Sequence, residues 1–224
     1  MLLYIHVPFC STRCRYCAFH SSPLGRGVDA ANSPAVRDYV DTLFLELAHW
    51  GDQLGGSEVQ SVFFGGGTPS LLSPRIIGLT MERINKYFRL VPKAEVTLEA
   101  NPESLRGGHR AAQYLDAGIN RLSIGVQSMD EGMLRLLGRP HKAQDSLHVA
   151  FLAREAGCAN INLDLMWGLP GQSVRQWLQT LKDVIRMTPD HISAYGLTLE
   201  PGGQIGRQDD VEDPRYPVPG ARNR

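Results

Sequence analysis

The residues that most clearly suit a chemical function are three cysteines near the N-terminus. Cys10, Cys14 and Cys17 form a C-x3-C-x2-C array directly after a short apolar stretch. Thiolate sulfur prefers soft centres such as zinc, cuprous ions and iron–sulfur clusters. A structural zinc site uses four protein ligands, and a [4Fe–4S] cluster is normally held by four cysteines. No fourth cysteine lies nearby, so a four-iron cluster here would keep one iron open to a small molecule.

Other uses of these cysteines stay open on spacing alone. A Cys3His zinc site could take its fourth ligand from His6 or His20, and the thiols could instead be reactive or form a disulfide. The remaining cysteine, Cys158, stands alone between an expected helix and an expected strand, and it is expected to be a small buried apolar residue. The sequence context of the histidines identifies no haem ligand.

Six apolar stretches alternate with helical patterns along the chain. The expected strands are residues 2–7, 61–64, 95–98, 121–126, 160–166 and 191–197. The expected helices are residues 33 to about 50, 73–88, a segment ending at Gly118, 133–137, 143–156 and 172–187. The buried face of the first helix is expected to contain Val36, Tyr39, Val40, Leu43, Leu47 and Trp50. A strand about every 30–35 residues predicts an α/β fold of βα units around a parallel sheet.

The unusual stretches of the sequence all follow expected strands. Right-handed crossovers place the C-terminal ends of parallel strands on one edge of the sheet. In barrel-type sheets, ligands bind at that edge. We therefore expect the cysteine array, the Gly65-Gly66-Gly67 triplet, Glu99 and Gln127 to lie near one another.

The sequence around the cysteines, Y-I-H-V-P-F-C before them and Y-C-A-F after, resembles the cluster motif of the radical S-adenosylmethionine (SAM) superfamily. These flanking residues are similar to those of the branch that contains oxygen-independent coproporphyrinogen III oxidases and HemW-type haem chaperones. The resemblance implies a [4Fe–4S] cluster held by Cys10, Cys14 and Cys17, with SAM chelating the open iron. It implies that the cluster passes one electron to SAM and so generates a 5′-deoxyadenosyl radical. It also implies a partial, partly open (β/α)6 barrel with a mostly parallel sheet.

The resemblance also assigns SAM contacts at two strand ends. Gly66, Gly67 and Thr68 match the G-G-G-T-P motif that contacts the amino group of SAM, and glycine lets the backbone approach a ligand closely. Glu99 ends the third strand in L-E-A-N-P and matches a glutamate that contacts SAM. A buried carboxylate needs a partner, which a ribose diol would provide, and the alternative is an internal salt bridge.

Five further residues match family positions near SAM. Gln127, Arg139 and Asp164 match positions that line the same cavity and serve a second SAM in the oxidase branch. For Arg139 and Asp164 the alternative is a structural ion pair or a helix-terminal contact. Tyr4 matches a residue that positions the methionine group of SAM, and Tyr16 matches a backbone contact near adenine. Either tyrosine could instead be a core aromatic residue.

The choice of branch rests on Phe19. The oxidase branch has another cysteine two positions after the third cluster cysteine, where this chain has Phe19. The C-A-F-H wording is closer to the chaperone branch, which binds haem and delivers it to respiratory apoproteins. The haem-binding H-N-x-x-Y motif of that branch belongs to a C-terminal domain, and this sequence contains no such motif. The alternatives are a coproporphyrinogen III dehydrogenase of porphyrin biosynthesis and an inactive fragment that binds cluster and SAM; whether the chain is an enzyme stays open.

Composition sets the remaining expectations. Hydrophobic residues make up 42% and charged residues 21% of the 224 residues, which is typical of a globular core. The 23 basic residues equal the 23 acidic ones in number, so nucleic acid and anionic membrane surfaces are not expected partners. The sequence has no apolar stretch long enough for a membrane span and no recognisable signal peptide. Clustered cysteines in a cysteine-poor chain favour a reducing compartment, and we expect a cytoplasmic protein with haem or porphyrin, haem-accepting proteins and an electron donor as partners.

Domain organisation follows from the same patterns. Residues 1–206 are expected to form the radical SAM core domain. Residues 207–224 are rich in proline and charge without an apolar period, and they are expected to be a poorly ordered tail. The resemblance covers only about the first half of a family member, so the family's smaller C-terminal domain is expected to be lacking here.

Overall fold

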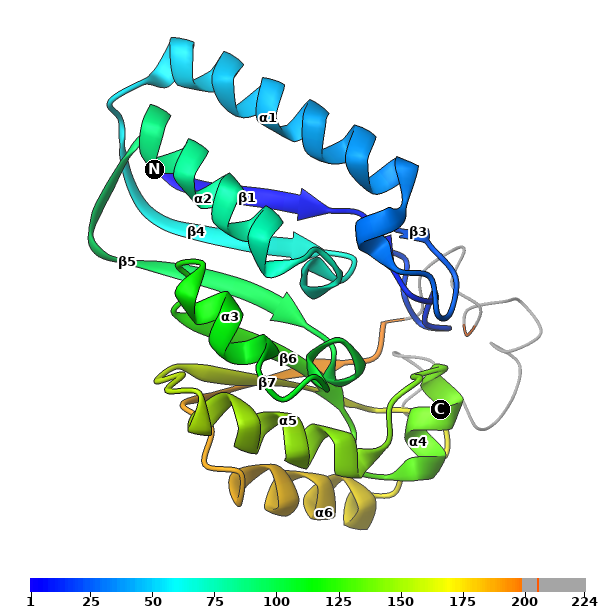
Figure 1. The fold of residues 1–224 in the computed structure, drawn as a ribbon. Helices are drawn as coiled ribbons and strands as arrows, with labels where there is room; N and C mark the ends of the chain where they lie inside the picture. Colours follow the sequence, from blue (N-terminus) through cyan, green and yellow to red (C-terminus); the bar gives the residue numbers. More distant parts are fainter. Residues whose placement is uncertain (199–204, 206–224) are drawn as a thin grey trace, which may run out of the picture.

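The computed structural model describes residues 1–198 and residue 205. Six parallel strands form one sheet in the order β1-β4-β5-β6-β7-β8 (Figure 1). These strands are β1 (Leu2–Val7), β4 (Glu58–Gly66), β5 (Arg89–Ala100), β6 (Arg121–Gln127), β7 (Ile161–Trp167) and β8 (His191–Gly196). Two short strands, β2 (Phe9–Cys10) and β3 (Ser22–Pro23), pair with each other beside the C-terminal end of β1.

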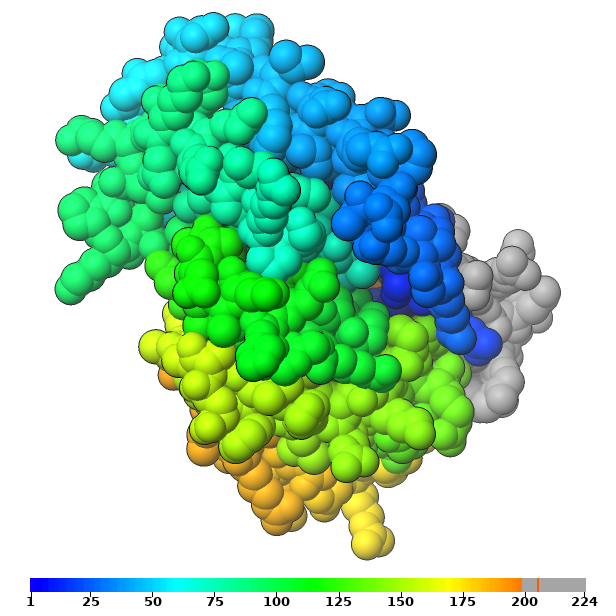
Figure 2. Space-filling model, viewed as in Figure 1, coloured from blue at the N-terminus to red at the C-terminus, as the bar shows by residue number. Residues whose placement is uncertain are grey.

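Helices connect the strands and cover one face of the sheet (Figure 1). They are α1 (Pro34–Leu54), α2 (Pro74–Tyr87), α3 (Arg110–Asp116), α4 (Glu131–Leu137), α5 (Ala143–Glu155) and α6 (Val174–Ile185), with short 3-10 segments η1 (Ala30–Asn32), η2 (Pro69–Leu71) and η3 (Pro102–Leu105). Figure 2 shows the surface that these helices form over that face. The expected α/β fold with a parallel sheet is therefore confirmed.

Local sequence signals explain where several helices begin and end. Ser73 accepts a backbone hydrogen bond at the start of α2, with Pro74 at the first helical position. Ser173 and Gln176 form a capping box at the start of α6. Gly138 ends α4 with a φ of 72°, a left-handed conformation that glycine adopts without steric cost.

The core lies between the sheet and the helices. Val62, Leu98, Leu122 and Leu163 lie on four neighbouring strands and have no exposed surface. They pack in one cluster with buried residues of α1, α2, α3, α5 and α6. Apolar burial on this scale supplies most of the driving force for folding.

Two details of the elements differ from the sequence expectations. Strands β4 and β5 extend further toward their N-termini than 61–64 and 95–98, because polar residues there pair across the strands, with a 2.8 Å ion pair between Arg89 and Glu58. Trp50, expected in the buried face of α1, is 45% exposed. Gly51 is the buried residue at that turn, and a Cβ there would lie 2.5 Å from the Tyr87 ring. The tryptophan expectation was wrong because a glycine contact brings α1 close to α2.

Two expectations concern parts of the chain beyond the sheet. The expected disordered tail at 207–224 lies outside the described residues. Among the residues that the structure describes, no helix is both long and apolar enough to cross a membrane.

Candidate functional site

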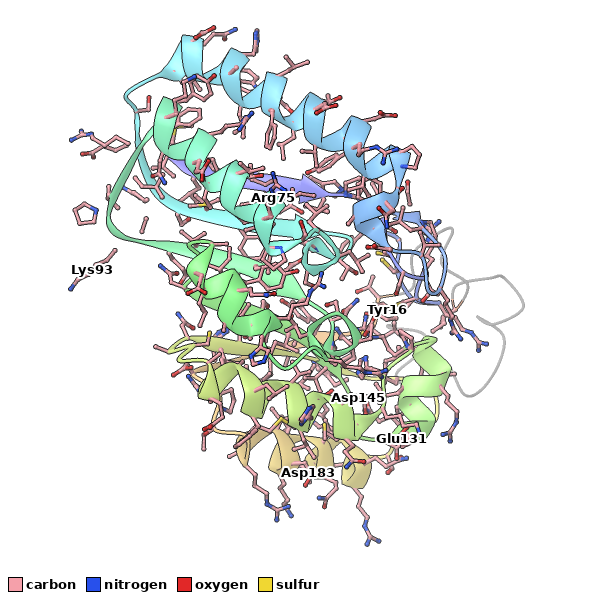
Figure 3. The ribbon with its side chains drawn as sticks, in the orientation of Figure 1. Tyr16, Arg75, Lys93, Glu131, Asp145 and Asp183 are labelled. Atoms are coloured by element: carbon pink, nitrogen blue, oxygen red, sulfur yellow. The ribbon has the colours of Figure 1, made fainter. Side chains whose placement is uncertain are left out.

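A cavity of about 450 Å³ lies at the C-terminal ends of the strands. All the site residues predicted from the sequence line it except Tyr4: Cys10, Cys14, Tyr16, Cys17, Gly66, Gly67, Thr68, Glu99, Gln127, Arg139 and Asp164. Figure 3 shows Tyr16 at this end of the molecule and Lys93 at the opposite end. The parallel topology therefore brings side chains that are far apart in sequence to one place.

The cysteine loop is held by backbone hydrogen bonds on both sides. Leu24 donates to the carbonyl of Cys10 over 2.8 Å, and Arg15 donates to the carbonyl of Leu137 in α4 over 3.0 Å. All three cysteines are free thiols and half-buried. Burial raises the pKa of the Cys10 and Cys17 thiols, so metal binding there would have to displace their protons.

The spacing of the thiols bears on which metal they could hold. Within residues 1–198 and 205, no three histidine, cysteine or acidic side chains are close enough together to bind a single metal ion. Zinc–sulfur bonds of about 2.3 Å require ligand sulfurs within about 4 Å of one another. A four-iron cluster binds each cysteine through a different iron, which suits three thiols that line one cavity without converging on a single point. The donor set therefore fits a [4Fe–4S] cluster.

The glycine triplet packs directly against the cysteine loop. A Cβ at Gly67 would lie 2.5 Å from the carbonyl oxygen of Phe9 and 3.0 Å from Cys10 Sγ. Thr68 donates its backbone N–H to the same Phe9 oxygen over 2.7 Å. The absence of a side chain at Gly67 is thus required for the two loops to meet at one wall of the cavity.

Glu99 is a carboxyl group facing the cavity. Its one protein hydrogen bond among the described residues comes from the Gly66 backbone N–H over 3.1 Å, and it forms no salt bridge there. Burial, and secondarily the nearby Asp164 carboxylate, raise its pKa from 4.5 to about 7. Such a group is poorly satisfied by the protein and suits a ligand that donates hydroxyl hydrogen bonds.

Asp164 and Gln127 are fixed on neighbouring strands. Asp164 accepts hydrogen bonds from Ser123 Oγ over 2.9 Å and Asn162 Nδ2 over 2.8 Å. Gln127 is nearly buried and has a φ of 66°. A residue other than glycine rarely adopts this backbone conformation, and such strain concentrates at functional sites.

The two tyrosines differ in position. Tyr16 lines the cavity and packs with Leu137 and Met166, and burial raises its pKa. Tyr4 lies on β1 with its ring stacked against Phe63 at a centroid distance of 6.0 Å, and its hydroxyl lies 3.2 Å from His6 Nδ1. The structure thus places Tyr4 beside the cavity rather than in its wall.

Arg139 reaches from the end of α4 into the wall behind the cysteines. Its guanidinium donates to Cys14 Sγ over 3.5 Å, to the Gly125 carbonyl over 2.6 Å and to Asn101 Oδ1 over 2.5 Å. Burial opposes its charge, but Tyr16, Cys14 and Glu103 outweigh burial and raise its pKa. It makes no ion pair with Asp164 among the described residues, so the alternative of a pair between these two is not seen.

Several cavity residues were missed in the sequence. Asn101, Ser123, Gly125 and Met166 also line the wall. Alternation along β6 and β7 could have indicated Ser123 and Met166, because residues two apart on a strand share a face. Asn101 lies two positions after Glu99, where the strand has ended and alternation gives no guidance.

Comparisons with known proteins agree with this geometry. A family model described as the radical SAM superfamily matches residues 4–184. The protein "Radical S-adenosyl methionine domain-containing protein 1, mitochondrial" of Bos taurus is 43% identical over 97% of this chain and 47% of its own length. Heme chaperone HemW of Escherichia coli is 41% identical over 93% of this chain and 53% of its own length.

A solved structure gives the same answer for the fold. The radical SAM enzyme coproporphyrinogen III oxidase (HemN) from Escherichia coli superposes with a TM-score of 0.83 and 29% identity, over 97% of this chain and 49% of that one. This chain spans about half the length of the relatives it matches. Its sequence and its fold both place it, together with HemW and HemN, in one family: the chain belongs to the radical SAM superfamily.

Proposed function

We propose that this chain is the cluster- and SAM-binding core of a haem chaperone of the HemW type, which binds haem and delivers it to haem proteins. The observation that carries the proposal is the 41% identity to HemW of Escherichia coli, which covers 93% of this chain. The identity to HemN is 29% over a similar length of this chain.

The assignment of SAM contacts rests on how the cavity is built. Three thiols face it from the N-terminal loop, and two carboxyl groups, Glu99 and Asp164, face it from the strands. We assign the cluster to Cys10, Cys14 and Cys17, which fits the three ligands of a cluster with one open iron. When bound, the cluster would supply one electron to SAM. Glu99 would accept hydrogen bonds from the ligand's hydroxyl groups, and Gly66 and Gly67 would present the backbone wall.

Phe19 supports the chaperone over the oxidase. It lines the cavity and is 69% exposed, and the resemblance of the C-A-F-H stretch favours the chaperone branch at this position. An apolar ring at the mouth of the cavity would offer a face for stacking against a flat tetrapyrrole. A thiol there would instead belong to the oxidase pattern.

A coproporphyrinogen III dehydrogenase is the second candidate. The TM-score of 0.83 to HemN favours it, as does the position of Gln127, Arg139 and Asp164 in one cavity wall. The third candidate is a fragment that binds cluster and SAM without further activity. It is the activity that the residues lining the cavity support by themselves.

The first test is anaerobic reconstitution with iron and sulfide, followed by EPR of the reduced protein with and without SAM. We expect a [4Fe–4S]⁺ signal that changes when SAM is added. A cluster that ignores SAM, or zinc in place of iron in metal analysis, would contradict the proposal.

The second test separates the candidate functions. The loaded protein is titrated with haem, followed by its Soret absorption, and is separately incubated with coproporphyrinogen III, SAM and reductant. A chaperone is expected to bind haem stoichiometrically and to form no protoporphyrinogen. Appreciable product would establish the dehydrogenase. If the protein neither binds haem nor forms product, the third candidate, a fragment that only binds cluster and SAM, would be supported.

Partners and location follow the same proposal. We propose haem or porphyrin, haem-accepting respiratory proteins and an electron donor as partners, and a cytoplasmic location, which the cysteine content favours. The Bos taurus relative is named as mitochondrial. Cell fractionation with an antibody to this chain tests the location.

A further inference from the structure

A continuous chain of side-chain hydrogen bonds joins two of the cysteines through residues outside the cysteine loop. Arg139 donates to Cys14 Sγ over 3.5 Å and to Asn101 Oδ1 over 2.5 Å. Asn101 Nδ2 donates to Thr68 Oγ1 over 3.0 Å, and the Thr68 hydroxyl donates to Cys10 Sγ over 3.7 Å. Asn101 thus links Thr68, the donor to Cys10, with Arg139, the donor to Cys14.

The direction of donation in this chain is fixed by chemistry. A guanidinium can only donate, so the oxygen of the Asn101 amide must face Arg139. The amide nitrogen then faces Thr68 and donates to its hydroxyl oxygen. The hydroxyl hydrogen of Thr68 therefore stays available for Cys10. From Arg139 to Cys10 the three bonds run in the same sense, so each polarises the next. Arg139 also donates in the other direction to Cys14, so a sulfur accepts a hydrogen at each end of the chain.

The surrounding structure holds Asn101 in place. Its carbonyl oxygen accepts hydrogen bonds from the backbone and the hydroxyl of Ser104, over 3.0 Å and 2.7 Å, in the η3 turn that follows β5. A Cβ on Gly125 would lie 3.0 Å from both Asn101 Oδ1 and Arg139 Nη2. The missing side chain at Gly125 therefore leaves the space in which the two groups meet.

We propose that Asn101 is a positioning residue that orients Thr68 and Arg139 toward Cys10 and Cys14, and so raises the reduction potential of the cluster. The proposal rests on the proposed function, because it requires a cluster on these cysteines. Hydrogen bonds to cysteine sulfur stabilise the more negative reduced state of an iron–sulfur centre. Groups that do not touch the metal commonly set its properties by orienting those that do.

The test is an EPR-monitored redox titration of the reconstituted protein and its variants. Asn101→Leu keeps the approximate volume but removes both links, and we expect a shift to more negative potential with iron content unchanged. Thr68→Val removes only the Cys10 branch and is expected to shift the potential less in the same direction. Thr68→Val added to Asn101→Leu should shift the potential less than it does alone, because the oriented bond has already been lost.

Asn120→Leu is the matched control. Like Asn101, Asn120 uses both ends of its side-chain amide, but its partners are backbone groups: it accepts from Val96 N and donates to the Ala94 carbonyl, over 2.8 Å each. It lies before β6, at the opposite end of the strands from the cavity. Its loss is expected to lower thermal stability and to leave the reduction potential unchanged.

The outcomes separate this inference from the proposed function. A wild-type cluster that responds to SAM, with the same potential in Asn101→Leu, would overturn the role of Asn101 and leave the function intact. If Asn101→Leu takes up no cluster, Thr68→Val and Gly125→Ala decide, and unchanged potentials in both overturn the inference. No cluster in the wild-type chain overturns the proposed function and this inference together.

Discussion

The two faces of the central sheet have different chemistry although they belong to the same strands. On β6, Leu122 and Ile124 pack against the helices and are completely buried, while Ser123 and Gln127 line the cavity. On β7, Leu163 belongs to the core and Asp164 faces the cavity. The helix-covered face gains stability from apolar burial, whereas the cavity face presents polar and strained groups.

This difference teaches where function can be changed without loss of the fold. A substitution on the helix-covered face is expected to lower stability and leave ligand binding alone. A substitution on the cavity face is expected to change ligand binding, with a smaller loss of stability or a gain. The predictions below test that separation.

The largest expected effect comes from the cysteines, because Cys14 lines the cavity and Cys158 lies in the core behind the sheet. Cys14→Ala removes one of three cluster ligands and is expected to abolish the [4Fe–4S] signal while the circular dichroism spectrum stays unchanged. Cys158→Ala is the matched control, because Cys158 lies in the core and is 2% exposed. Iron analysis and EPR after reconstitution measure both. Full iron content in Cys14→Ala, or loss of the cluster in Cys158→Ala, would break the comparison.

Neighbouring residues on β6 provide the next test. Leu122→Ala creates a cavity in the core and is expected to lower the free energy of unfolding by about 2–5 kcal/mol. Ser123→Ala removes hydrogen bonds with Asp164 and Asn162, at a cost of about 1–2 kcal/mol. Urea denaturation measures both. Without the Ser123 hydroxyl, Asp164 is held less firmly in the cavity wall. SAM affinity should therefore fall more in Ser123→Ala than in Leu122→Ala. The reverse order would contradict the division between the two faces of the sheet.

Glu99 gives a pH-dependent effect of opposite sign. Because its pKa in the fold is about 7 against an ordinary 4.5, the folded protein holds this proton more tightly than the unfolded chain. Stability contributed by the protonated form is therefore lost as the pH rises from about 4.5 to 7. Glu99→Gln removes that loss and is expected to raise the free energy of unfolding of the ligand-free protein by roughly 2–3 kcal/mol at pH 8.

The measurement for Glu99 is urea unfolding at pH 4 and at pH 8. The difference between Glu99→Gln and wild type should be small at pH 4 and large at pH 8. Glu155→Gln, on the exposed surface of α5, should change stability little at either pH. A difference for Glu99→Gln that is independent of pH would show that its carboxyl group is not held protonated by the cavity.

The fold could be predicted from the sequence because its main signal is apolar. Each strand has a short apolar run, so the six strands and the helices between them were predicted in the right order. The N-terminal ends of β4 and β5 were missed because polar residues such as Glu58 and Arg89 interrupt the apolar pattern there, and their pairing depends on a partner far along the chain. Local patterns carry no information on such pairing.

The candidate site was predictable to the extent that it lies at strand ends. Motif positions such as Glu99 and Asp164 line the cavity because the parallel topology collects strand ends at one edge. Asn101 was not identified, because its role depends on a contact with Arg139 that lies 38 positions away. Spacing places residues at an edge, but only the folded chain shows which polar groups meet there.

The smallest expected effect concerns strain at Gln127. Its φ of 66° lies in the left-handed region, where a residue with a Cβ is destabilised by roughly 1–2 kcal/mol relative to glycine. Gln127→Gly and Gln127→Ala remove the same amide, but only the glycine variant relieves the strain. We expect the free energy of unfolding of the glycine variant to be about 1 kcal/mol higher than that of the alanine variant. Both variants should lose SAM affinity equally. Equal stabilities would mean that β6 can relax around this residue, and the cavity face would then owe its shape to hydrogen bonds alone.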